Sequence, residues 1–340
     1  MEESRYATPE NSTAATAAEY TRFAGRSVPA HHGNPATEYA ALKAGAAAIY
    51  RPQGVLRLAG RDPVGMLDAI LTNKVPGGGN LGVYALLLSQ KGRIQADLRV
   101  VRGGEEVLIL TEPEGAEAAK EILGRYAPFS RVKLEELEDW SVLGLYGPRA
   151  GELLGSPELA EHEAAGITLG DETMPAIGVA LPVPGYDLIG PAESLQISHD
   201  YLLDRGAAPA GSYAYETARV EAGTPRFGAD MTPENFPAEA GVLDRAVSFT
   251  KGCYPGQETV ARMHYRGHPN RTLHRLKIEG PPPPTGTPLL QNEKPVGNLT
   301  SVAPLQVAGE TLALGYLHRK ANLEAPLIAA NATVALSPPV

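Results

Sequence analysis

The chain contains one cysteine, Cys253, among its 340 residues. A single thiol cannot form an internal disulfide, and it cannot supply the several thiolates of a self-contained zinc or iron–sulfur centre. The fold must therefore be held by hydrophobic cores, for which 43% hydrophobic and 20% charged residues are ordinary proportions. A chain of this length has material for two or three domains. The cysteine count also favours a reducing compartment.

Charge and the N-terminal sequence argue against several classes of protein. The formal net charge is −9, whereas binding to nucleic acid or to an anionic membrane needs clustered positive charge. The first twenty residues lack the apolar core of a signal peptide, and they are not rich in arginine. No run of about 20 apolar residues occurs that could span a membrane. We therefore expect a cytoplasmic protein with no membrane partner, and a nucleic-acid partner is unlikely on this charge.

The cysteine lies in a polar segment, Lys251-Gly252-Cys253-Tyr254-Pro255-Gly256-Gln257-Glu258. A structural cysteine usually fills an apolar space in a helix or strand, whereas a proline followed by glycine favours a tight bend. A lysine two residues before the thiol would favour the thiolate. From the residues alone, a functional thiol and a chance cysteine near a loop remain equally good interpretations.

The wider sequence resembles a known family. The motif reads K-G-C-Y-x-G-Q-E, a second motif R-x-E-x-G-x-P-x-F-G occupies residues 219–228, and Arg262 and Arg266-Gly267 follow downstream. These motifs are similar to those of the YgfZ family, folate-binding proteins linked to iron–sulfur enzyme maintenance. That family is related in sequence to the glycine-cleavage T-protein, an aminomethyltransferase that uses tetrahydrofolate. The resemblance runs from about residue 45 to the C-terminus.

The resemblance implies a tetrahydrofolate-binding factor that supports iron–sulfur protein assembly or maintenance. Its ligand would be folate, and its partners would be iron–sulfur client or assembly proteins. Cys253 would be the functional thiol at the mouth of the folate cavity, either as a nucleophile, as a redox thiol or as a transient cluster ligand. The alternative is a true aminomethyltransferase of the glycine-cleavage type. A cysteine transferase acting on RNA or protein is a weaker hypothesis, because the net charge disfavours RNA.

Three residues are candidates for folate binding. Glu221 occupies the R-x-E position that holds the pterin in the T-protein family, and a carboxylate can accept two parallel N–H bonds; an exposed helix-end glutamate is the alternative. Arg219 shares the motif. Tyr84 stands where relatives often place an aromatic residue near the ligand, although a strand tyrosine packed on a neighbour is as good an interpretation.

Asp97 is a candidate for catalysis. Strand alternation places it opposite Ala96 and Leu98, which by pattern alone would make it a solvated carboxylate. The T-protein family has two consecutive aspartates here, one of them catalytic. This chain has Ala96 at the first position, so Asp97 either faces the folate nitrogens or the transferase role is lost. No metal site is predicted.

The remaining motif residues have simpler predicted roles. We expect Lys251 to poise the thiolate, and Glu258 to pair with Arg262 at i,i+4 spacing. Gly252, Tyr254, Gly256 and Gln257 complete the motif. Residues 262–271 are locally basic, and they could meet the glutamate carboxylates of folate, RNA phosphates or only solvent.

The order of predicted elements indicates an α+β fold. We expect a mobile tail or short surface helix over residues 1–33, a first α+β domain over 34–150, a second α+β segment carrying both motifs over 151–270, and a β-rich domain over 271–340. The resemblance implies a T-protein-like multidomain fold around a folate pocket. Short β-like pieces after the Pro281–Pro284 run predict a small barrel-like C-terminal domain.

Individual elements can also be predicted. Residues 35–50 are expected to form one helix, and Asp62-Pro63 should begin another. Strands are expected at 55–58, 83–89, 93–101, 106–111, 132–137 and 140–146, followed by a hairpin over 177–189. Helices are expected at 113–123, 192–205 and 212–221. Residues 223–257 carry little periodicity, and a long loop inside a compact domain is usually functional or disordered.

Overall fold

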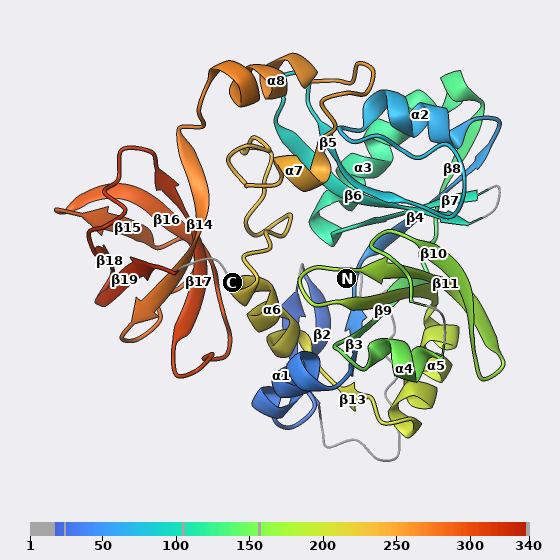
Figure 1. Cartoon of the computed structure of the whole chain (residues 1–340), viewed down its shortest axis with the longest axis horizontal. Coiled ribbons are helices and arrows are strands. Elements are labelled where there is room, and N and C mark those ends of the chain that lie inside the picture. The colour runs from blue at the N-terminus through green and yellow to red at the C-terminus, as the bar shows by residue number, and fades with distance from the viewer. Residues whose placement is uncertain (1–17, 24, 104–105, 156–157, 338–340) are drawn as a thin grey trace, which may run out of the picture.

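The computed structural model describes residues 18–23, 25–103, 106–155 and 158–337. Two β-sheets with their helices lie beside each other, and a closed β-barrel lies at the other side of the molecule, next to α6 (Ser212–Glu221) (Figure 1). The segment between α6 and α8 (Gln257–Arg266) runs between the sheets and the barrel. The α+β class and the C-terminal barrel are confirmed.

The first sheet has five strands in the order β5-β6-β7-β4-β8. They are β4 (Gly54–Gly60), β5 (Val83–Leu88), β6 (Ile94–Gly103), β7 (Glu106–Thr111) and β8 (Val132–Glu136). Helices α2 (Pro63–Ile70) and α3 (Pro113–Tyr126) cover one face, and a short 3-10 helix η1 (Ala127–Ser130) follows. The predicted start of α2 is confirmed, because Asp62 accepts a hydrogen bond from the N–H of Gly65.

Alternation along β6 divides its side chains between two environments. Ala96 and Leu98 are fully buried in the core beneath α2 and α3. Asp97 and Arg99 therefore point to the opposite face of the sheet. That face is covered by the second sheet, since Arg99 pairs there with Asp187 of β12 (Gly185–Pro191). The face expected to be solvated is thus an interface between the sheets.

The second sheet has six strands in the order β10-β11-β12-β9-β3-β13. Besides β12 they are β3 (Ala47–Arg51), β9 (Trp140–Tyr146), β10 (Ala164–Leu169), β11 (Glu172–Val179) and β13 (Ala208–Pro209). Helices α4 (Ala150–Leu154) and α5 (Ala192–Asp204) pack against it. Because β3 and β9 belong to this sheet, the sheets do not divide at residue 150, where the first domain was expected to end.

The expected helix over 35–50 is wrong in its second half. Helix α1 (Pro35–Ala44) is followed at once by β3. Ala46 and Ala48 pack into one core, whereas Ala47 and Ile49 pack into another. Burial of successive residues on opposite sides requires the two-residue period of a strand, and the alanines alone do not reveal that there is a core on each side.

The N-terminal segment is also more ordered than expected where it is described. Strands β1 (Glu19–Phe23) and β2 (Arg26–His31) pair antiparallel, where a tail or helix was expected. Val28 and Ala30 of β2 are buried. Residues 1–17 lie outside the described part of the chain.

The C-terminal domain is a closed barrel in the strand order β14-β17-β16-β15-β18-β19. The strands are β14 (Arg271–Glu279), β15 (Pro288–Gln291), β16 (Lys294–Val302), β17 (Thr311–His318), β18 (Leu327–Ala329) and β19 (Ala332–Leu336). Leu276, Leu289, Leu299 and Leu317 fill its interior. Closure leaves no free sheet edge.

The segment 223–257 has little regular structure, as expected, but it is well packed. Its one short helix among the described residues is α7 (Leu243–Ala246). Phe227, Met231, Val242 and Tyr254 form a hydrophobic cluster with strands β5 and β6. The segment is therefore packed against the first sheet. No helix in the described part of the chain is long and apolar enough to cross a membrane.

Candidate functional site

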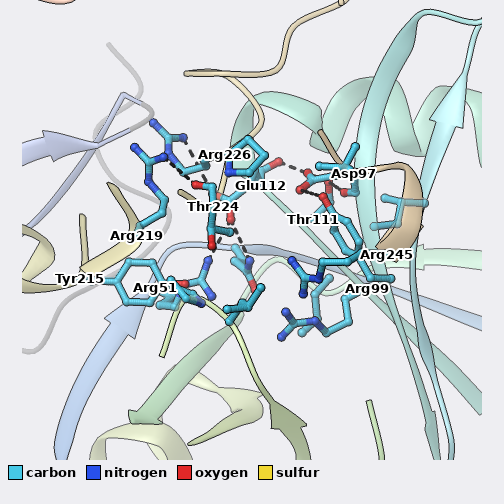
Figure 2. A pocket seen from close by; sticks show the side chains of 18 residues that line it. Arg51, Asp97, Arg99, Thr111, Glu112, Tyr215, Arg219, Thr224, Arg226 and Arg245 are labelled. Atoms are coloured by element: carbon cyan, nitrogen blue, oxygen red, sulfur yellow. Dashed lines mark hydrogen bonds and ion pairs between the residues drawn. The ribbon is translucent and has the colours of Figure 1, made fainter. Parts of the chain in front are cut away.

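A polar cavity lies where the first sheet, the second sheet and the segment 223–257 meet (Figure 2). It contains about 670 Å³ of space free of protein atoms, part of it open to solvent. Ligand sites in proteins commonly occur at this position, between domains. The lining residues come from all three parts and include Arg51, Gln53, Tyr84, Asp97, Arg99, Thr111, Glu112, Tyr215, Arg219, Thr224, Arg226 and Arg245.

Asp97 and Tyr84 stand together in this cavity. The hydroxyl of Tyr84 donates to Asp97 Oδ2 at 3.1 Å. Burial, and next to it the negative charge of Glu112, raise the pKa of Asp97 to about 7. Ala96 faces the core against Gly115 of α3. An aspartate at position 96 would face the core, so having Ala96 there does not reduce the number of carboxylates in the cavity.

Glu112 is a cavity residue that the sequence analysis missed. Its Oε1 accepts from Arg51 at 2.9 Å and from Gln53 Nε2 at 3.0 Å, and its side chain is 7% exposed. Glu112 is the N-cap residue of α3, but its side chain makes no capping bond. The available signal was a carboxylate at the end of β7, directly before a helix that begins with proline.

Several buried oxygens in the cavity wall have no hydrogen-bond partner among the described residues: Asp97 Oδ1, Gln53 Oε1 and Thr224 Oγ1. Buried polar atoms are normally paired, and an unpaired one is costly. All three atoms can accept a hydrogen bond. The cavity therefore suits a ligand that presents several N–H donors.

Arg219 lines the cavity, but the protein itself uses its guanidinium. Nη1 donates to Asp230 Oδ2 at 2.7 Å, and Nη2 donates to Glu216 and to Ser301 of the barrel, each at 2.8 Å. Asp230 is fully buried as a side chain and also accepts from Thr300 and Ser301 of β16. Arg219 thus joins α6 to the barrel.

Glu221 is not among the residues that line the cavity. Its Oε2 accepts from the hydroxyl of Tyr39 at 2.7 Å and from Lys43 Nζ at 2.8 Å, both on α1. This ion pair holds the end of α6 against α1. The structure therefore does not bring Glu221 together with Asp97 and Tyr84.

Lys251 occupies a buried site at the end of α2. Its side chain is 1% exposed, and Nζ donates to the carbonyls of Asp68, Leu71 (2.7 Å) and Asn73 (3.2 Å). Burial lowers the pKa of this ammonium, and the nearby Asp68 carboxylate opposes that effect. A cation at the C-terminus of a helix is favourable for its dipole and its unpaired carbonyls. The ammonium is thus committed to α2.

The motif is held again on the other side of the cysteine. Tyr254 is buried in the hydrophobic cluster against β5 and β6. Gly256 has φ +82°, and a Cβ there would lie 2.6 Å from the carbonyl oxygen of Ser89 at the β5–β6 turn. Only glycine fits both the conformation and the space. The chain is therefore fixed at Lys251, Tyr254 and Gly256.

Cys253 is exposed between these fixed points and is not among the cavity-lining residues. Gly252 beside it is also exposed. The structure thus presents the thiol to solvent on a well-anchored loop, and does not place it in the cavity wall with Asp97. No group of three or more His, Cys, Asp or Glu side chains in the described ranges could hold a metal ion.

Helix α8 carries the rest of the motif and the basic segment. Gln257 begins the helix, and Glu258 in its first turn is exposed. The expected ion pair between Glu258 and Arg262 is not formed. His264 instead stacks on Phe249, with ring centroids 4.1 Å apart. The outer face of the helix is left in solvent.

Two family models match the chain. Residues 12–171 match the GCVT N-terminal domain, and residues 271–340 match the CAF17 C-terminal beta-barrel domain. The two matches cover the first sheet, strands β3, β9 and β10 of the second sheet, and the whole barrel.

The curated relatives include YgfZ proteins and an aminomethyltransferase. The tRNA-modifying protein YgfZ of Yersinia enterocolitica is 30% identical over 189 residues, which are 55% of this chain and 56% of that protein. An aminomethyltransferase of Rubrobacter xylanophilus is 27% identical over 308 residues, 87% of this chain and 82% of that protein. The chain thus spans little more than half the length of the YgfZ relative.

A solved structure matches nearly the whole fold. The glycine cleavage system aminomethyltransferase T of Bartonella henselae superposes with a TM-score of 0.84 over 95% of this chain and 94% of that one, at 21% identity. At this identity the match shows the fold. The two domain models, the YgfZ relatives and the K-G-C-Y-x-G-Q-E segment support a YgfZ-family protein related to the glycine-cleavage T-protein.

Proposed function

We propose that this chain binds tetrahydrofolate in the cavity between the sheets. The observation that carries the proposal is the set of buried acceptors without protein donors, Asp97 Oδ1, Gln53 Oε1 and Thr224 Oγ1. A reduced pterin ring presents N–H and NH₂ groups along its edge, which are the donors that these oxygens lack. The family resemblance, which implies a folate ligand, supports the same conclusion.

Two carboxylates compete for the pterin edge, and one experiment separates them. The R-x-E motif assigns the role to Glu221, whereas the cavity geometry favours Glu112 beside Asp97. We expect Glu112→Gln to raise the Kd for tetrahydrofolate about tenfold or more, on the scale of a lost charge-assisted bond. Glu221→Gln should leave that Kd within about twofold. Calorimetric titration of both folded variants decides, and the opposite ranking would return the role to Glu221.

We further propose that Cys253 is the functional thiol of a factor that supports iron–sulfur proteins. The motif resemblance supports this role, and so does the exposure of the thiol between two anchored residues. In a strain lacking the gene, Cys253→Ala should fail to restore the activity of iron–sulfur enzymes, while tetrahydrofolate affinity stays at the wild-type value. Full restoration of enzyme activity by Cys253→Ala would show that the thiol is not required for this function.

An aminomethyltransferase activity of the glycine-cleavage type is the second candidate. It is favoured by Asp97, because a cavity carboxyl with a pKa raised to about 7 can both accept and donate a proton near neutral pH. The test is ammonia release from an aminomethylated lipoyl carrier protein in the presence of tetrahydrofolate. Absence of turnover by folded, folate-loaded protein would exclude this activity.

RNA binding is tested separately, because one group of relatives is named tRNA-modifying. With a net charge of −9, we expect no electrophoretic shift of tRNA at physiological salt. An electrophoretic shift of tRNA at this salt concentration would show that RNA is a partner.

A further inference from the structure

Two arginines of the cavity are only partly used by the protein. Arg99 on β6 donates from Nη1 to Asp187 Oδ2 at 2.6 Å, and its buried Nε has no partner among the described residues. Arg245 on α7 donates from Nη2 to Glu161 Oε1 at 2.8 Å, which is its one side-chain hydrogen bond within the described ranges. A guanidinium has five N–H donors. Both side chains line the cavity, so donors remain there for a ligand.

The two guanidiniums lie close to one another, around His162. The pKa of His162 is lowered to about 4, first by burial and then by the positive charges of Arg99 and, more weakly, Arg245; Glu161 opposes the shift. Two like charges gathered at a partly buried place repel each other. An anion bound between them would offset that repulsion, which is the usual reason for such clusters at binding sites.

The cavity is also polarised along Tyr84. The Arg245 guanidinium lies 5.5 Å from the centroid of the Tyr84 ring, while the hydroxyl of the same ring donates to Asp97. Figure 2 shows Arg99 and Arg245 side by side, with Arg219 at the opposite end of the cavity. One region thus offers acceptors and the adjoining region offers cationic donors. A ligand that matches both regions has N–H donors at one end and an anionic group at the other.

We propose that Arg99 and Arg245 form a carboxylate-binding subsite that takes the glutamate end of the bound folate. The inference rests on the proposed folate function and adds the orientation of the ligand: pterin toward Asp97 and Gln53, glutamate toward the two arginines. Guanidinium groups match carboxylates geometrically because they can donate two parallel bonds.

The experiment compares two ligands on three proteins. 6-Methyltetrahydropterin keeps the reduced pterin of tetrahydrofolate but carries no carboxylate. Arg245→Met should raise the Kd for tetrahydrofolate about tenfold, the loss expected for one charge-assisted contact, and leave the Kd for 6-methyltetrahydropterin unchanged. Arg205→Met is the matched control, because Arg205 also lies 5.5 Å from a tyrosine ring, that of Tyr201, and does not line the cavity. It should change neither Kd.

Each outcome has a distinct meaning. Equal losses for both ligands, or no loss for tetrahydrofolate, would overturn the subsite while leaving the folate function intact. Wild-type protein that bound neither ligand would refute the folate function and the subsite together. Arg99→Lys keeps a charge beside the buried Asp187 and serves as a second variant if Arg245→Met fails to fold. It should also weaken the binding of tetrahydrofolate and not that of the ligand without the glutamate. Inorganic phosphate competing better than glutarate would overturn the carboxylate assignment.

Discussion

Replacing Lys251 by methionine separates two accounts of the cysteine motif. The sequence suggests that this lysine activates Cys253, whereas the structure commits its ammonium to three carbonyls at the end of α2. Methionine keeps most of the volume but donates no hydrogen bond. If the ammonium is an anchor, the variant should be less stable and its thiol should titrate as in the wild type.

The size of the effect follows from the contacts. Hydrogen bonds from a charged donor contribute roughly 1.5–3 kcal/mol each, and two of the three contacts to Nζ are short. Burial of the ammonium opposes this gain, as the lowered pKa of Lys251 indicates. We therefore expect Lys251→Met to lower the free energy of unfolding by about 2–4 kcal/mol. Lys91→Met, at an exposed turn, is the control and should change it by less than about 0.5 kcal/mol.

Two measurements on the same samples decide between the accounts. Urea denaturation gives the stability loss, and the rate of alkylation by iodoacetamide as a function of pH gives the midpoint for Cys253, the only thiol in the chain. The anchor account expects lost stability with an unchanged midpoint. A midpoint displaced upward by about one pH unit, with stability retained, would refute our reasoning and restore the activating role.

Three other changes test the site and its supports. Asp97→Asn should stabilise the protein at pH 8 and not at pH 4. Because the folded-state pKa of Asp97 is raised to about 7, the stabilising contribution of this carboxyl is present at low pH and is lost as pH rises to 7, by no more than about 4 kcal/mol. Thermal midpoints of variant and wild type that differ equally at both pH values would contradict this. Gly256→Ala should lower the free energy of unfolding by roughly 1–3 kcal/mol, because the new Cβ would meet the Ser89 carbonyl. Gly252→Ala is the control: its Cβ would lie in open space, so urea denaturation should show almost no change. Arg219→Met should lower the free energy of unfolding by about 3–5 kcal/mol, because it leaves the buried Asp230 carboxylate without its cation. If the double variant Arg219→Met/Asp230→Asn recovers no stability, the unpaired carboxylate is not the cause.

Local patterns in the sequence were sufficient for most elements. The Asp62 N-cap, the meander of β5, β6 and β7, and helix α6 each have a signal within a few residues. The strand at 47–51 was missed because its alternation is between two buried faces, and alternation is visible in sequence only when one face is polar.

The site was predicted only in part, and the reason is physical. Asp97 and Tyr84 are neighbours on adjacent strands, so strand pairing brings them together. Glu112 and Arg245 reach the cavity only through packing between the sheets and segment 223–257, which no local pattern encodes. Glu221 has a strong motif signal, yet its orientation depends on α1, a helix 180 residues away in the chain.

The buried charges around Asp230 bear on how the molecule can be divided. The family models separate the barrel from the sheets at residue 271, but Ser301 and Thr300 of the barrel complete the polar shell of a carboxylate that belongs to the preceding segment. A fragment truncated at residue 270 would expose that carboxylate and the arginine that binds it. We therefore expect the barrel and the preceding segment to unfold together, although sequence comparison separates them.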